Sequence, residues 1–77
     1  MQTVTIYGKG FMIKVHDSEG GALVQAYGGT MGRVDKAVDC LMAHRPAPQV
    51  AVNLLKSELA DVIERVEGSF NNQHTEK

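Results

Sequence analysis

The hydrophobic pattern of this chain changes its period once, near Gly28-Gly29. Before that point apolar and polar residues alternate, which is typical of strands with one buried face. After it apolar residues recur every three to four positions, which is typical of amphipathic helices. A chain of 77 residues supports one modest core, and a run of strands followed by a run of helices favours an α+β domain.

Three segments of the first half are predicted to form strands, at residues 3–7, 11–16 and 22–27. The middle segment is the clearest, because Phe11, Ile13 and Val15 alternate with other side chains. Glycine-containing turns separate the segments, and glycine tolerates the positive φ of tight turns. We therefore expect a small antiparallel three-stranded meander with one apolar face.

The second half predicts two helices that cover this sheet. The first ends near Arg45, because Pro46 and Pro48 disfavour helix in the residues before them. Its apolar face has the spacing of a helix and consists of Val34, Ala37, Val38, Leu41 and Met42.

The second helix is predicted to begin at Pro48 and to end before Gly68, residue types that suit the first turn and the C′ position. Asp61 and Arg65 would then form an i,i+4 ion pair on its outer side. Its apolar residues fall within an arc of about 120°, and they are Ala51, Val52, Leu55, Leu59, Val62, Ile63 and Val66. The alternative is a short fourth strand at residues 49–52, with Asn53 capping a shorter helix.

The predicted architecture is ββ(β)αα, a three-stranded antiparallel sheet packed against a two-helix hairpin. A single α+β domain is expected over residues 1–68. Residues 69–77 are polar and aperiodic, which indicates a flexible tail.

The charge balance disfavours direct binding to nucleic acid. Eight basic and nine acidic residues give a formal charge of −1, and the basic residues are spread singly along the chain. Nucleic-acid-binding proteins concentrate basic residues on one face, because phosphate contacts dominate their affinity.

Cysteine content and the N-terminal pattern favour a reducing, cytoplasmic setting. Cys40 is the only cysteine, so no internal disulfide forms. A secreted domain of this size usually needs disulfides. The first residues lack the basic and apolar segments of a signal peptide, and no apolar run is long enough to span a membrane.

No motif specifies an enzyme, a cofactor site or a metal site. The segment Gly28–Gly32 lacks the spacing of a phosphate loop or a dinucleotide loop. Cys40 and His44 lie four residues apart on one flank of the first helix, which leaves a small enzyme or a metal-binding protein as an alternative. A lone helical cysteine is more often a small apolar residue, so we expect no catalytic, cofactor-binding or metal-binding residue.

Apolar surface is left over after the core is assigned. A sheet covered on one side leaves its other face open, and an exposed apolar patch on a small protein usually marks a binding surface. Val50 and Leu54 also fall outside the main arc of the second helix. The predicted partner-binding residues lie on these two surfaces, and they are Met12, Lys14, Leu23, Tyr27, Leu54, Glu58, Asp61 and Arg65. The expected partner is another protein, with a second copy of the chain as the alternative.

Residues 11–44 resemble the HicB-like antitoxin domain. The matching pieces are the acidic glycine-containing turn Asp17-Ser18-Glu19-Gly20-Gly21, the strand at residues 22–27 and the segment Asp35-Lys36-Ala37-Val38. The proline-glycine loop that follows this strand in the family is absent. The resemblance implies a toxin or another regulator as the binding partner.

In size and plan alone the chain also resembles the small accessory proteins of phages and other mobile elements, of which anti-CRISPR proteins are the best-known group. These are single small domains that block a host complex by occupying its surface. We therefore expect a non-enzymatic domain that acts stoichiometrically as an inhibitor or adaptor.

Overall fold

The first half of the chain forms the three-stranded antiparallel meander that its alternation predicts. The computed structural model describes residues 2–28 and 32–70. Strand β1 spans Thr3–Gly8, β2 spans Phe11–Ser18 and β3 spans Gly21–Tyr27. Each strand pairs antiparallel with the next one along the chain, which confirms the predicted order.

A glycine is required at the start of β3. Gly21 has a φ of 117°, which residues with a Cβ rarely adopt, and a Cβ here would lie 2.8 Å from the carbonyl oxygen of Arg45. This close approach lets the amide of Ala22 donate a hydrogen bond of 3.0 Å to the carbonyl of Pro46. The connection between the two helices is therefore fixed to β3.

Two helices follow the meander. Helix α1 spans Gly32–His44, and α2 spans Pro48–Glu58. Pro48 lies in the first turn of α2, where its missing amide donor costs no hydrogen bond. Residues 49–52 are helical, so the alternative of a strand there is wrong. Neither helix, nor any other within the described residues, is long and apolar enough to cross a membrane.

The predicted extension of the second helix to Val66 is wrong. Helix α2 ends at Glu58, and after a turn the chain forms β4, Ile63–Glu67, which pairs antiparallel with β1. Gly68 therefore follows a strand, not a helix. The remaining edge of β1 presents backbone hydrogen-bonding groups, and β4 pairs with them. If the helix continued past Glu58, these groups of β1 would have no strand partner.

A β-bulge explains why the apolar pattern of β4 resembles that of a helix. Successive residues of β1 pair with Ile63 and Arg65, so Glu64 is an extra residue in β4. Ile63 and Val66 both pack against the core although they lie three positions apart. A spacing of three is also what one face of a helix produces.

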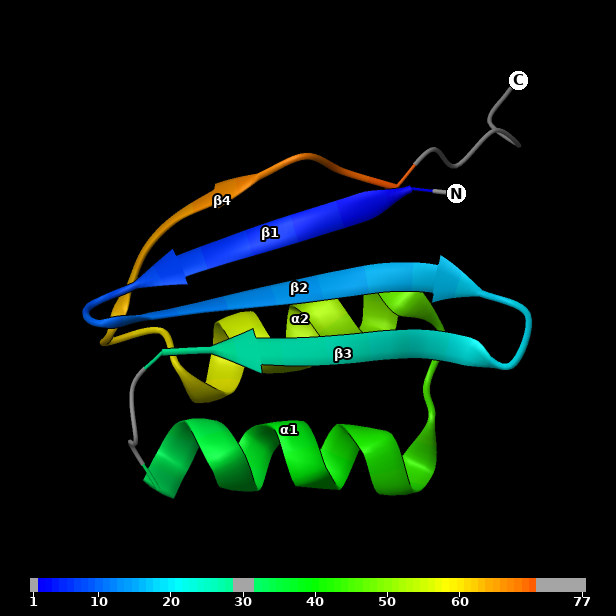
Figure 1. Cartoon of the computed structure of the whole chain (residues 1–77), viewed down its shortest axis with the longest axis horizontal. Helices are drawn as coiled ribbons and strands as arrows, with labels where there is room; N and C mark the ends of the chain where they lie inside the picture. The colour runs from blue at the N-terminus through cyan, green and yellow to red at the C-terminus, as the bar shows by residue number, and fades with distance from the viewer. Residues whose placement is uncertain (1, 29–31, 71–77) are drawn as a thin grey trace.

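The strands form one sheet in the order β3-β2-β1-β4 (Figure 1). Helix α2 lies behind β2 and β3 in this view, and α1 runs alongside β3. The near face of the sheet carries no helix of the described residues. The sheet therefore has one covered face and one open face, as the sequence predicts.

The core is the apolar layer between the covered face and the two helices. Its buried residues are Val4, Ile6, Phe11, Ile13, Val15, Ala22, Val24, Val34, Leu41, Ala51, Val52, Leu55 and Leu59. Met42 was expected on the buried face of the first helix, but it lies at the margin of that face and is 36% exposed.

Little of the expected tail at residues 69–77 is described. Phe70 packs against the core, and residues 71–77 lie outside the described part of the chain.

Substitution of Leu55 by alanine tests the core. Leu55 is fully buried, so Leu55→Ala should lower the free energy of unfolding by about 2–5 kcal/mol. Leu23 is 41% exposed on the open face, and Leu23→Ala should cost about 1 kcal/mol or less. Chemical denaturation of both variants measures the difference, and equal losses would contradict this assignment of the core.

Candidate functional site

An aromatic and basic row crosses the open face of the sheet. Strand register places Tyr27 of β3 beside Met12 of β2, Met12 beside Tyr7 of β1, and Tyr7 beside Arg65 of β4. The four side chains share one face because residues directly opposite one another in antiparallel strands point the same way. We call this set the tyrosine row.

Cation–π contacts hold both ends of the tyrosine row. The guanidinium carbon of Arg65 lies 4.0 Å from the centroid of the Tyr7 ring, and Lys14 Nζ lies 5.7 Å from the centroid of the Tyr27 ring. Arg65 also forms an ion pair of 3.1 Å with Glu67. These contacts restrict the side chains before any partner arrives, which lowers the entropy lost on binding.

A chain of hydrogen bonds stabilises the neighbouring part of the open face. His16 lies between Thr3 and Gln25, with Nδ1 2.8 Å from the Thr3 hydroxyl and Nε2 2.9 Å from Gln25 Oε1. Because an amide oxygen only accepts, Nε2 of His16 carries the donated proton. The Tyr27 hydroxyl donates to the same Gln25 oxygen at 3.1 Å. These hydrogen bonds therefore join β1, β2 and β3 beside the tyrosine row.

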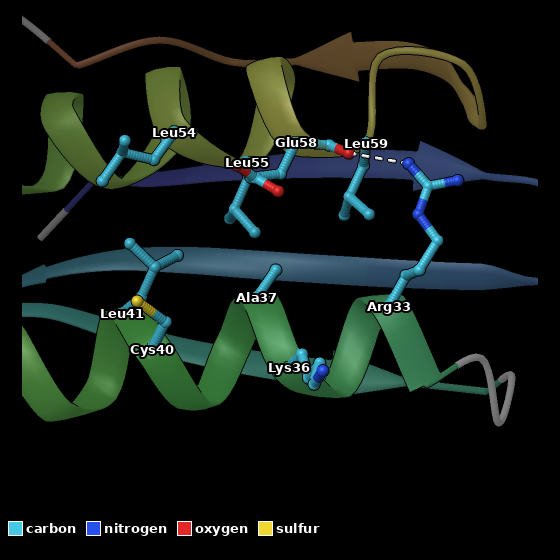
Figure 2. A pocket seen from close by; sticks show the side chains of 9 residues that line it. All are labelled: Arg33, Lys36, Ala37, Cys40, Leu41, Leu54, Leu55, Glu58 and Leu59. Atoms are coloured by element: carbon cyan, nitrogen blue, oxygen red, sulfur yellow. Dashed lines mark hydrogen bonds between the residues drawn. The ribbon is translucent and has the colours of Figure 1, made fainter.

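The other side of the molecule carries a groove between α1 and α2, of about 310 Å³. Its floor is apolar and includes the buried residues Leu41, Leu55 and Leu59. Figure 2 shows the two helices as its banks. The side chains that line it are Arg33, Lys36, Ala37, Cys40, Leu41, Leu54, Leu55, Glu58 and Leu59.

Arg33 bridges the two helices at one end of this groove. Its guanidinium donates to both carboxylate oxygens of Asp61, at 2.8 and 2.9 Å, and to the carbonyl of Glu58 at 2.9 Å. The bridge thus joins the beginning of α1 to the end of α2. It supplies a donor to a carbonyl of the last turn of α2, where carbonyl groups have no amide partner within the helix. The expected pairing of Asp61 with Arg65 is wrong, because Asp61 lies in the turn after α2 and Arg65 lies in β4, so the two do not share a helix.

The Arg33 hydrogen bonds lower the pKa of Asp61 below its ordinary value, and the same interaction raises the pKa of Arg33. Both side chains are more than half exposed, 53% for Arg33 and 65% for Asp61. Solvent therefore screens the pair and keeps its contribution to stability small.

The predicted partner-binding residues separate into two groups on different surfaces. The open face of the sheet carries five of them, Met12, Lys14, Leu23, Tyr27 and Arg65. The groove carries Leu54 and Glu58, and Asp61 belongs to the bridge at its end. The two groups do not form one site.

Tyr7, which lies between Met12 and Arg65 in the row, was not predicted from the sequence. The sequence does contain the pattern that indicates its position. Tyr7 continues the alternation of Thr3 and Thr5 and so faces away from the core. The groove was not predicted either, because helical periodicity does not report how far apart two helices pack.

Cys40 and His44 were the basis of the enzyme and metal alternative. Cys40 is exposed on a bank of the groove, and His44 is the last residue of α1. Within residues 2–28 and 32–70, no group of three or more histidine, cysteine, aspartate or glutamate side chains is placed to hold a metal ion. The glycine-rich segment includes residues 29–31, which lie outside the described residues.

Comparisons with protein-family models, with curated proteins and with solved structures found no match to this chain. The resemblance to the HicB-like domain stays a prediction.

Asp61→Asn tests the bridge through its pH dependence. Because the pKa of Asp61 is lowered in the folded chain, its contribution is present above the ordinary aspartate pKa and is lost as the pH falls through the lowered value. The variant should therefore unfold at a lower temperature than the parent chain at neutral pH, and the two should converge in acid. Thermal melts across pH 2–7 measure this.

Asp39→Asn is the matched control, because Asp39 is exposed and forms no ion pair within the described residues. A constant difference between Asp61→Asn and the parent chain across the acid range would contradict the role of the bridge.

Proposed function

We propose that this chain is a non-enzymatic protein-binding domain that acts stoichiometrically, as an inhibitor or adaptor, through the open face of its sheet. The tyrosine row is the observation that carries the proposal. It brings two tyrosines, a methionine and an arginine together on one accessible face.

The composition of this face supports protein recognition. Tyrosine, methionine and arginine are enriched at the cores of protein interfaces, and tyrosine and arginine are common among the residues that dominate binding energy. Leu23 and Tyr27 leave 41% and 38% of their surface exposed. The face therefore offers apolar area together with side chains already held in position.

The charges of the face favour a protein over a nucleic acid. Lys14 and Arg65 are the cations of the face, and Arg65 is already paired with Glu67. Tight binding to phosphates needs several unpaired cations, and the net charge of the chain is −1. Stacking of bases on the tyrosines is the competing hypothesis, and the experiment below distinguishes it.

The chain's size and plan agree with a stoichiometric role of the kind found in small phage accessory proteins, including anti-CRISPR proteins. The single cysteine agrees with action in a reducing cytoplasm. The partner is then a protein or protein complex of the host cell.

Affinity capture with the immobilised chain tests this function. Proteins bound from a lysate of the native host are identified by mass spectrometry, with and without nuclease treatment. Met12→Glu places a charge in the tyrosine row and should weaken capture of the partner at least about tenfold. Tyr27→Ala should act in the same direction.

Met42→Glu is the matched control, because Met42 is exposed on α1, away from the sheet face. Circular dichroism confirms that each variant is folded. Full capture by both folded sheet variants would refute the proposal, and loss of capture after nuclease treatment would favour nucleic acid instead.

A further inference from the structure

The groove between α1 and α2 has the features of a self-complementary surface. We propose that two copies of this chain pair through it, with their helix layers face to face. The inference concerns the side of the molecule opposite the tyrosine row, so it does not rest on the proposed function.

Large and small side chains face each other across the groove. Leu54 on the α2 bank is 46% exposed and lies beside the apolar floor. The α1 bank carries the small residues Ala37 and Cys40. In Figure 2, Leu54 and Cys40 lie toward the same end of the groove on opposite banks. A partner that brings a leucine to the α1 bank would fill the space that these small side chains leave.

Opposite charges also face each other across the groove. Lys36 lies on the α1 bank and Glu58 on the α2 bank, at a similar level along the groove (Figure 2). Among the described residues, neither side chain forms an ion pair or a hydrogen bond, since Glu58 accepts from Arg33 through its backbone carbonyl. An occupant that covers these charges would need to offer an acid above Lys36 and a base above Glu58, because burying an unpaired charge is costly.

A second copy of the chain supplies each of these groups in the right place. A two-fold axis along the groove exchanges the banks and keeps the position along the groove unchanged. Leu54 of one copy then lies over Cys40 of the other, and Lys36 of each copy lies over Glu58 of its partner. Contacts that occur twice in this way are what a two-fold interface requires.

The Arg33 bridge closes one end of the groove. It crosses from α1 to α2 at the Leu59 end of the groove, as Figure 2 shows. The same two-fold axis places the bridges of the two copies over each other at that end. The pairing would leave both open sheet faces pointing outward, so the dimer would be bivalent.

Light scattering over a range of protein concentrations tests the pairing. The parent chain should approach twice its 8.4 kDa mass as the concentration rises. Lys36→Glu and Glu58→Lys should each raise the dissociation constant at least tenfold, because each places like charges against each other. The double variant Lys36→Glu/Glu58→Lys should restore the dimer, since it only exchanges the two signs.

Lys56→Glu is the matched control, because it makes the same charge change on α2 outside the groove. Cys40 provides a second readout, since its exposed thiol should react more slowly with iodoacetamide as the dimer forms. A monomer at every concentration, or a dimer that folded Leu54→Glu leaves intact, would overturn the proposal. The proposal would also be overturned if the chain stays monomeric and Cys40 is protected only after a host protein or an amphiphile is added. The groove would then be assigned to that ligand.

Discussion

The structure depends on a single apolar layer between one face of the sheet and two short helices. Alternate residues of β1, β2 and β3 enter this layer, and the stripes of α1 and α2 complete it. Two helices cover only one face, so the opposite side chains of the same strands remain in contact with solvent. The open face, with its tyrosine row, is thus a direct consequence of how the core is built.

Connections at the margin of this layer determine the second surface. The hydrogen bond from Ala22 to Pro46 fixes the connection between the helices, and Arg33 joins their other ends. Between these two points the helices leave a groove whose banks carry small residues and the opposite charges of Lys36 and Glu58. The molecule therefore presents two chemically different surfaces, an aromatic and basic one on the sheet and an apolar one with mixed charges on the helices.

Much of this arrangement could be predicted from periodicity, which reports the face on which a residue lies. Alternation along β2 predicts Met12 on the face opposite Phe11, whereas the face of Tyr27 depended on the strand register, which places it beside Met12. Strand β4 was missed because its bulge gives Ile63 and Val66 a helical spacing, and because pairing with β1 is a long-range event. Arg65 was predicted to bind a partner from the outer side of the second helix, yet it lies in β4 and joins the tyrosine row there. The groove depends on the distance between helices, which no local pattern contains.

Hydroxyl-radical footprinting of the chain, free and bound to its captured partner, tests whether the open face of the sheet is the binding surface. Tyr7, Met12 and Tyr27 should be oxidised in the free chain and protected in the complex. Met42, exposed on α1, should be oxidised equally in both states. Protection of Met42 with unchanged oxidation of Met12 and the two tyrosines would contradict the claim that the open sheet face is the surface this protein uses.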